Sequence, residues 1–503
     1  MRTVIVGAGA SGCVLAARLS ERADEEITLV EAGPDYKPES LPADLADGRH
    51  NALTSHDWGF RHSPNSQQVG MPMPRGRVVG GSSAINTCIA IRGQPQDFDA
   101  WAELGLTDWS WDKVLPAFRR LETDLDHDTP WHGRSGPLPI RRHPPEEWTP
   151  WQAAFVEACR GLGHADCDDH NAPGATGVGP HAMNKIDGRR ISAAEAWLTP
   201  DVRKRPNFRL LAQTEAIVVR FRGTRVVGLV VRDATGAQRT LDADRVILCA
   251  GCFLTPMILL RSGVGPRAEL ERLAVEPVAI NEGVGSRLLD HPGSAVFFLP
   301  KWGKMKRSDP LIQNMCRIST GTTPVPGDVQ IQPGSKVPFP WVTFPAVSLM
   351  FSIGKPFGVG TIQFPSVRPG ASPVITSALL DDDRDRATAV SVLEQVREIA
   401  EQPVMRAIAR HIIPGQAKLK DAATIDGWIR RFSGSGYHPC GTVPMGADSD
   451  PMAATDGHGR VRGVEGLHVA DASLIPEIPS SNTHLPSLMI GEHIAELLGA
   501  PVA

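Results

Sequence analysis

The most constraining feature of this sequence is a glycine-rich turn within its first twenty residues. Thr3–Val6 reads as a short buried strand, and it is followed by Gly7, Gly9 and Gly12 and then by a helical apolar pattern. In such a unit the first glycine permits a tight turn, the second lets backbone amides approach a pyrophosphate, and the third lets the helix pack on the strand. The helix N-terminus would then face the phosphates. The pattern predicts an α/β fold with a dinucleotide-binding domain.

A carboxylate after the next expected strand narrows the choice of dinucleotide. Ile27–Val30 reads as a second buried strand, and Glu31 follows it, 19 positions beyond Gly12. A carboxylate at this spacing can bind ribose hydroxyl groups. Because it would repel a 2′-phosphate, NADP is disfavoured and FAD or NAD remains.

The composition is that of an ordinary globular enzyme. Charged residues make up 21% of the 503 residues, the net charge is −4, and Lys and Arg form no basic stripe, so nucleic acid is not an expected partner. No apolar run reaches the ~20 residues of a membrane span, and the N-terminus enters a strand directly. We therefore expect no transmembrane segment and a cytoplasmic location. The eight Cys residues lie mostly in apolar segments, which indicates buried thiols rather than a disulfide framework.

A second glycine cluster, between Gly76 and Gly93, is too dense in small residues for an ordinary linker. It reads GRVVGGSSAINTCIAIRG. Such a density of small residues indicates that a ligand or another part of the chain approaches its backbone closely. This segment resembles the first signature of the glucose-methanol-choline (GMC) family of flavin oxidoreductases. The resemblance continues at residues 249–265, at GRRISAAEAWL (188–198) and at GSRLLDHP (285–292). It implies that the dinucleotide is FAD.

The resemblance also implies the domain organisation. We expect an α/β protein in which a discontinuous Rossmann-like FAD-binding domain carries an α+β substrate-binding cap built on an antiparallel sheet. Within the cap, residues 361–365 and 373–376 read as antiparallel strands and 384–412 as helices. The expected FAD-binding segments are 1–160, 200–295 and 435–503, and the expected cap segments are 161–199 and 296–434.

Cofactor contacts follow from the resemblance residue by residue. The ADP part would lie on the first glycine turn and Glu31, the flavin on the second glycine cluster, and the adenine against the backbone of Val218. Some relatives attach the flavin covalently through a His beside the motif residue Asn86, whereas this chain has Ile85 there, so we expect non-covalent FAD. The expected cofactor-binding residues are Gly7, Gly9, Ala10, Ser11, Gly12, Glu31, Ala32, Arg77, Gly80, Gly81, Ser82, Asn86, Thr87, Cys88, Ile89, Val218, Ala250, Gly251, Asp471, Ala472, Asn482 and Thr483.

Two residues of the C-terminal part are expected to be catalytic. The segment HPCGT beginning at His438 resembles the family motif that places a histidine beside the flavin. We expect His438 to be the general base, because alcohol oxidation requires loss of an O–H proton and imidazole titrates near neutral pH. Asn482 stands where relatives have a second active-site residue, His or Asn, and is expected to orient the substrate oxygen. His484 is expected to support this pair.

These features predict FAD-dependent oxidation of a neutral primary alcohol or hydrated aldehyde, with O2 slightly favoured as the electron acceptor. Three alternatives remain: a dehydrogenase that passes electrons to a quinone or another carrier, a redox-neutral hydroxynitrile lyase of the same family, and a non-catalytic flavin-binding module.

Two further groups of residues have structural interpretations. The loop 164–170 contains possible metal ligands, but Asp169-His170-Asn171 resembles a family loop at the substrate entrance, so no metal site is expected. Four aromatic residues of the cap are expected to pack in its core or to line the substrate pocket: Trp302, Phe339, Trp341 and Phe344.

Overall fold

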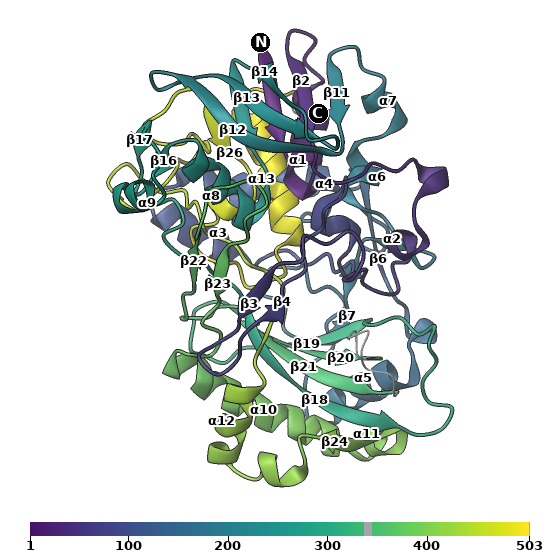
Figure 1. Ribbon diagram of the computed structural model, residues 1–503. Helices are drawn as coiled ribbons and strands as arrows, with labels where there is room; N and C mark the ends of the chain where they lie inside the picture. Colours follow the sequence, from purple (N-terminus) through teal and green to yellow (C-terminus); the bar gives the residue numbers. More distant parts are fainter. Residues whose placement is uncertain (337–344, 502–503) are drawn as a thin grey trace.

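A parallel five-stranded sheet forms the centre of one half of the molecule. The computed structural model describes residues 1–336 and 345–501 of the chain, and this sheet lies in its upper half (Figure 1). Its strands are short and rich in Val, Ile and Leu, as is typical of parallel sheets that are covered on both faces. In spatial order they are β11 (Phe208–Leu211), β2 (Glu26–Val30), β1 (Arg2–Val6), β15 (Arg245–Leu248) and β26 (Leu467–Val469).

The helix that follows β1 packs against the last helix of the chain. Helix α1 (Ala10–Leu19) and α13 (His484–Leu497) approach so closely that a Cβ at Gly491 would lie 2.7 Å from the carbonyl oxygen of Ser11. The hydroxyl of Ser11 donates to the carbonyl oxygen of Ser487 at 2.7 Å. The end of the chain is thereby fixed to the beginning of the sheet.

A seven-stranded antiparallel sheet forms the other half, with helices beneath it in Figure 1. Its strands run in the order β24 (Ala409–Ile413), β18 (Pro292–Pro300), β21 (Val347–Ile353), β20 (Val329–Gly334), β19 (Asn314–Ile318) and β7 (Gly177–Pro180), and β25 (Gly434–Ser435) also pairs with β18. The helices on this side are α5 (Pro150–Gly161), α10 (Asp383–Glu401), α11 (Pro403–Ile408) and α12 (Ala422–Arg431).

Smaller elements complete the fold. The other helices are α2 (Ala43–Ala46), α3 (Pro95–Glu103), α4 (Trp111–Leu121), α6 (Ala193–Trp197), α7 (Pro200–Arg203), α8 (Gly251–Arg261) and α9 (Arg267–Arg272). The remaining strands are β3 (Arg61–Ser63), β4 (Met71–Pro72), β5 (Glu122–Asp124), β6 (Leu138–Arg142), β8 (Ala182–Met183), β9 (Lys185–Ile186), β10 (Arg189–Arg190), β12 (Thr214–Arg222), β13 (Arg225–Asp233), β14 (Gln238–Asp242), β16 (Val264–Gly265), β17 (Ala279–Ile280), β22 (Thr361–Gln363) and β23 (Val374–Thr376).

The expected α/β fold class is confirmed by this arrangement of sheets and helices. We propose the division into an FAD-binding domain and a cap with two adjustments. Helix α5 packs in the hydrophobic core of the antiparallel sheet, although residues 150–160 were assigned to the FAD-binding domain. Strand β18 runs across the expected boundary at 295/296 without interruption.

Three expectations for the cap need correction. Strands β22 and β23 do pair antiparallel, but they belong to a separate four-stranded sheet with β3 and β4. The expected helical stretch 384–412 ends as strand β24, because its last residues pair with β18. Trp302 neither packs in the core nor lines a pocket, since its side chain is fully exposed, at 101%. Phe339, Trp341 and Phe344 lie outside the described residues.

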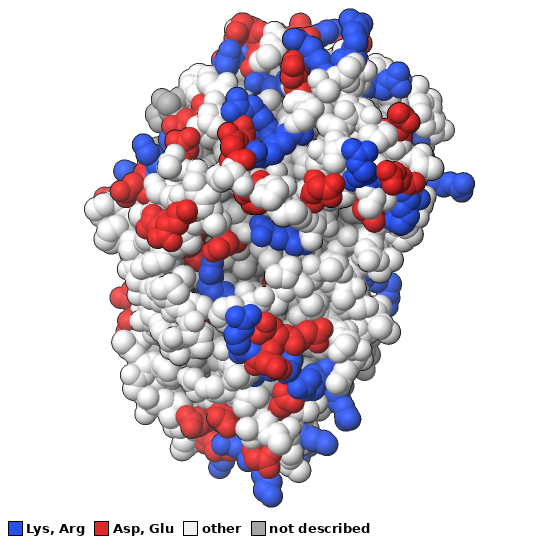
Figure 2. Space-filling view, turned by 90° about the vertical axis from the view of Figure 1, so that its left-hand side faces the viewer, with Lys and Arg blue, Asp and Glu red and all other residues white. Residues whose placement is uncertain are grey.

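Two surface properties bear on function. Among the described residues, no helix combines the length and the apolar character that crossing a bilayer requires. On the face shown in Figure 2, Lys and Arg side chains alternate with Asp and Glu, so this face carries charges of both signs.

Candidate active site

The two glycine-rich segments meet at the carboxyl ends of β1 and β15. Gly7 follows β1 with φ +98°, and a Cβ there would lie 2.4 Å from the carbonyl oxygen of Cys249. A Cβ at Gly81 would lie 2.7 Å from the Cα of Gly9, so the second cluster rests directly on the first. Gly9 faces the other way, because a Cβ there would meet no atom within 4 Å. The contact therefore leaves an open space beside the N-terminus of α1.

A cavity extends from this turn to the C-terminal segment around His438. Most of the expected cofactor residues line it, although they come from segments far apart in the sequence. The expected residues that line the cavity are Gly7, Gly9, Ala10, Ser11, Glu31, Ala32, Gly81, Ser82, Asn86, Thr87, Ile89, Ala250, Gly251, Asp471, Ala472, Asn482 and Thr483.

Five expected cofactor residues do not line the cavity, and in each case the local packing or backbone conformation explains why. Gly12 packs against the turn, where a Cβ would lie 1.9 Å from the carbonyl oxygen of Gly7. Gly80 has φ +104° and sets the turn behind Gly81. Cys88 is buried, and Arg77 is exposed over the ring of Trp58. Val218 follows an irregularity in β12, and Thr214 to Ala216 line the cavity in its place. Direct cofactor contacts of these five residues remain predictions from the sequence.

Glu31 stands at the edge of the cavity with its carboxylate fixed by backbone amides. It accepts hydrogen bonds from the amides of Ala8 at 2.9 Å and Gly33 at 2.8 Å. Burial raises the pKa of Glu31 to about 7, although these amides oppose the shift. The carboxylate is thus oriented by the chain itself before any ribose hydroxyl reaches it.

At the other end of the cavity, His438 contacts one residue that was expected and one that was not. Its Nε2 lies 3.0 Å from Nδ2 of Asn482, the expected partner. Its Nδ1 lies 2.9 Å from Nδ1 of His291, which sequence reasoning did not single out. His291 in turn places Nε2 at 2.9 Å from the carbonyl oxygen of Pro479.

This chain of contacts determines where the protons lie. The carbonyl of Pro479 can only accept, so His291 must carry its proton on Nε2 and expose a lone pair on Nδ1. His438 must therefore donate from Nδ1, which leaves the lone pair of its Nε2 to accept from the Asn482 amide. The basic nitrogen of His438 consequently lies on the side of Asn482, which lines the cavity.

Both imidazoles are held neutral. Desolvation within the protein, followed by the nearby His291 and Arg75, holds the pKa of His438 well below its usual range. Burial likewise lowers the pKa of His291 to about 4. A neutral imidazole, which carries a lone pair on one ring nitrogen, is the form that a general base requires.

A buried carboxylate and a guanidinium position the backbone of this segment. Asp290 accepts from the backbone amides of His291 at 2.9 Å and His438 at 3.0 Å, and burial raises its pKa to about 6. Tyr437 has φ +63°, a strained value for a residue with a side chain, and Nη2 of Arg75 donates to its carbonyl oxygen at 2.8 Å. For Asp290 the sequence contained a signal, since a charged side chain is rare in an apolar segment such as LLDHP (288–292).

Comparisons with known proteins identify the family. Two family profiles described as GMC oxidoreductase match residues 1–293 and 356–491. The chain belongs to the GMC oxidoreductase family. It is 32% identical to 5-(hydroxymethyl)furfural oxidase of Methylovorus sp. (strain MP688), with 98% of each chain covered. It is 33% identical to oxygen-dependent choline dehydrogenase of Brucella anthropi, with 98% of this chain and 94% of the relative covered.

A solved structure agrees along the whole chain. The crystal structure of pyridoxine 4-oxidase from Mesorbium loti superposes with a TM-score of 0.92 at 31% identity and full coverage of both chains. These matches confirm the expected family, and with it an FAD-dependent oxidoreductase that acts on alcohols.

The cavity of this GMC oxidoreductase fits FAD on structural grounds. Gly9 and Gly251 present backbone where a Cβ would enter open space, and no side chain from the described part of the chain caps the N-terminus of α1. An anion can therefore approach both the amides and the positive end of the helix. Oδ1 of Asn482 and Nε2 of His484 are buried without a hydrogen-bond partner among the described residues, and both residues line the cavity. Such atoms are normally satisfied by a ligand or water.

Two further residues near His438 and Asn482 in this GMC oxidoreductase are titratable. His484 lines the cavity, and burial, followed by the charge of Arg190, lowers its pKa to about 4. Cys440 is buried, and burial raises the pKa of its thiol well above the usual range, which opposes thiolate chemistry. The supporting role of His484 remains a prediction.

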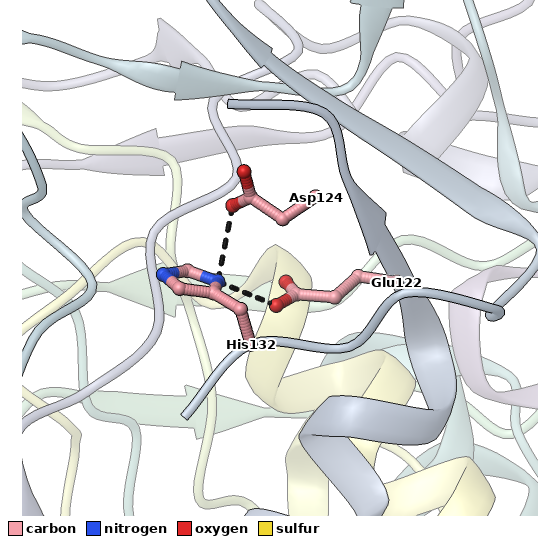
Figure 3. A group of neighbouring side chains, drawn as sticks. All are labelled: Glu122, Asp124 and His132. Carbon is pink, nitrogen blue, oxygen red and sulfur yellow. Dashed lines mark hydrogen bonds and ion pairs between the residues drawn. The ribbon is translucent and has the colours of Figure 1, made fainter. Parts of the chain in front are cut away.

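One cluster in the described part of the chain has the spacing of a metal site. Glu122, Asp124 and His132 are buried and place their ligand atoms within 4.8 Å of one another (Figure 3). However, Arg92 binds Glu122 at 2.6 Å, and Arg142 binds Asp124 at 2.9 Å. The carboxylates are already neutralised, so we interpret the cluster as a structural ion-pair network.

Proposed function

We propose that this GMC oxidoreductase oxidises a neutral primary alcohol or hydrated aldehyde, with His438 as the general base and non-covalent FAD as the hydride acceptor. The observation that carries the proposal is the neutral His438 imidazole, whose basic Nε2 lies beside Asn482 at the cavity. Bound FAD would accept the hydride from the carbinol carbon. The substrate hydroxyl would replace the Asn482 amide at Nε2 of His438, which then takes the hydroxyl proton, while the displaced amide holds the substrate oxygen in place.

The charges around the cavity favour a neutral substrate. Three carboxylates line its described part, namely Glu31, Glu215 and Asp471. Glu31 lies at the expected ADP end, and Glu215 forms an ion pair with Arg232 at 2.6 Å. Asp471 accepts from the amide of Gly251 at 2.8 Å and from the hydroxyl of Thr255 at 2.7 Å. No carboxylate on this wall is therefore available to bind a quaternary ammonium group beside His438.

The aromatic wall favours a ring-bearing alcohol. Trp58, Phe60, Phe253 and Tyr437 line the same cavity. Two relatives, 5-(hydroxymethyl)furfural oxidase and pyridoxine 4-oxidase, bear the names of aromatic hydroxymethyl compounds. We therefore favour hydroxymethyl groups on aromatic rings as substrates. Because both relatives are named oxidases, we favour O2 over a quinone as the acceptor.

Anaerobic mixing tests the reaction class. The holoenzyme would be mixed with benzyl alcohol, 5-(hydroxymethyl)furfural, pyridoxine and choline, and the flavin absorbance followed. We expect bleaching by the aromatic alcohols and little by choline. A redox-neutral lyase would show no bleaching by any alcohol, and stronger bleaching by choline would contradict the substrate class.

Reoxidation of the reduced enzyme tests the electron acceptor, and release of the cofactor by acid tests whether FAD is bound non-covalently. The reduced enzyme would be mixed with air-saturated buffer or with a quinone, and we expect faster return of the flavin absorbance with O2. Faster return with quinone would make the enzyme a dehydrogenase. Because Ile85 replaces the attachment residue, acid precipitation should release yellow FAD into the supernatant, and flavin retained in the pellet would contradict non-covalent binding.

A further inference from the structure

The loop between β18 and β19 presents an exposed tryptophan among positive charges. Trp302 is fully exposed, and Lys301, Lys304, Lys306 and Arg307 around it are exposed as well. Asp309 is the single carboxylate between Leu299 and Asn314, and its Oδ2 accepts from the backbone amide of Lys306 at 2.8 Å. The loop therefore carries a clear excess of positive charge on a protein whose net charge is −4.

The loop has a defined shape that keeps the indole outside. The amide of Lys304 donates to the carbonyl oxygen of Lys301 at 3.1 Å, which closes a turn with Trp302 and Gly303 at its tip. Gly303 has φ +74°, and a Cβ there would meet no atom within 4 Å. Met305 packs against the core of the antiparallel sheet. The chain thus partly buries the methionine and leaves the larger tryptophan in solvent.

Neighbouring elements extend the positive charge. The amide of Lys301 donates to the carbonyl oxygen of Ile408 at 2.8 Å, which holds the loop beside the end of α11 and the start of β24. Arg406 and Arg410 are exposed on these two elements. Within residues 1–336 and 345–501, none of the cations of the loop or of this edge forms a salt bridge.

We propose that this surface, the Trp302 loop with the adjoining edge of α11 and β24, docks on an anionic membrane surface. Tryptophan is enriched at the boundary between lipid headgroups and acyl chains, because its ring is apolar and its N–H is polar. Each Lys or Arg near an anionic lipid surface strengthens binding by about five-fold, so several together give a measurable interaction. The rest of the protein, with its net negative charge, would be repelled, so this loop also sets the orientation of docking.

Co-sedimentation with vesicles tests the docking surface. The holoenzyme would be mixed with vesicles of phosphatidylcholine alone and with vesicles that also contain phosphatidylglycerol. We expect it to pellet with the second kind only and to be released by added salt, because salt screens exposed charges. The tryptophan emission should shift to the blue on binding in the wild type and much less in W302S.

Paired variants separate this loop from general electrostatics. The K304E/K306E variant should bind the anionic vesicles at least about 25-fold more weakly, from the loss of two cations. The matched control R222E/R239E changes the net charge equally at exposed positions of β12 and β14, at the opposite end of the molecule (Figure 1). It should bind like the wild type, and all variants should keep their FAD and their rate of flavin reduction by a dissolved alcohol.

Three outcomes would overturn the proposal. The wild type could remain in the supernatant with anionic vesicles, or R222E/R239E could lose as much binding as K304E/K306E. The loop could also retain an acidic polypeptide such as polyglutamate while ignoring vesicles, which would make it a protein-docking surface.

Discussion

Two enclosed histidines of this protein are held in opposite protonation states by their surroundings. His132 contacts three carboxylates, from Glu122 at 2.8 Å, Asp124 at 3.0 Å and Asp169 at 2.9 Å. These contacts outweigh desolvation and raise its pKa to about 10. Among residues 1–336 and 345–501, the ring of His438 hydrogen-bonds only to an imidazole and an amide, and its pKa is held well below the usual range. The same side chain is therefore a structural cation in one place and a neutral imidazole, the form we propose for the base, in the other.

The comparison shows that burial alone does not decide the role of a histidine. The carboxylates around His132 are balanced by the guanidinium groups of Arg92 and Arg142. Three anions thus meet three cations, and each side chain is fixed by its neighbours. Around His438 the one close carboxylate, Asp290, is engaged by backbone amides and by the hydroxyl of Ser435, so it does not charge the imidazole.

Removal of the base should have the largest effect. In H438A the rate of flavin reduction by an aromatic alcohol should fall about 10³–10⁴-fold, because general-base catalysis is lost. Stopped-flow absorbance under anaerobic conditions measures the rate, and added imidazole should restore part of it. Flavin reduction at a near wild-type rate in H438A would refute the assignment of the base.

Removal of the structural cation should affect stability instead. H132L leaves three carboxylates, two of them buried, with two guanidinium groups, and an unpaired buried charge costs about 3–5 kcal/mol. We expect a much lower thermal midpoint, with flavin reduction unchanged at low temperature. H132Q, which keeps hydrogen bonds without the charge, should lie between H132L and the wild type. A catalytic defect in folded H132L would contradict the structural role.

Loss of the Asn482 amide beside the proposed base should cause the next largest effect, a slower reduction of the flavin. N482A removes the donor that lies 3.0 Å from Nε2 of His438. By analogy with the loss of one oxyanion-hole donor, flavin reduction should slow about 10²–10³-fold. N482D is the informative companion, because a carboxylate beside the imidazole would raise the pKa of His438 and make it resemble His132. An N482A variant with unchanged flavin reduction would exclude this role.

Loss of the second imidazole should have a smaller effect. H291F leaves Nδ1 of His438 without its acceptor, and one unmade buried hydrogen bond costs ~1–3 kcal/mol. We expect about ten-fold slower flavin reduction. Because His291 also lowers the pKa of His438, the acid limb of the pH–rate profile should move to higher pH. A slower enzyme with an unmoved profile would indicate only a packing defect.

Sequence reasoning predicted what is contiguous in the chain and missed what tertiary contacts decide. The glycine segments and HPCGT can be read locally because neighbouring residues build each turn. His291 and His438 are 147 positions apart, and Arg75 and Tyr437 are 362 apart, so neither contact has a local signature. The exposure of Trp302 was missed for the same reason, since an aromatic residue in an unassigned loop reads as core.

Strand register and strand pairing account for the other differences between the predictions from the sequence and the structure. An irregularity between Ala216 and Val218 shifts which residues of β12 reach the cavity. The strands β22 and β23 were predicted from their alternating pattern, but the pattern does not say that β23 pairs with β3, some 300 residues earlier. Strand partners of this kind depend on the whole fold.

The smallest effect concerns pH, and its sign differs between the two histidines. Since the pKa of His438 is lowered, the base stays neutral from about pH 8 to pH 6, and the rate of flavin reduction should be flat across this range. The pKa of His132 is about 10 in the folded state and ~6.5 in the unfolded state. The stability that the charged His132 contributes is therefore fully present below pH ~6.5 and is lost as the pH rises toward 10. The thermal midpoint should therefore decline on the alkaline side in the wild type and less in H132Q. A rate that falls steeply between pH 8 and pH 6 would mean that His438 is charged in that range, and the contrast with His132 would disappear.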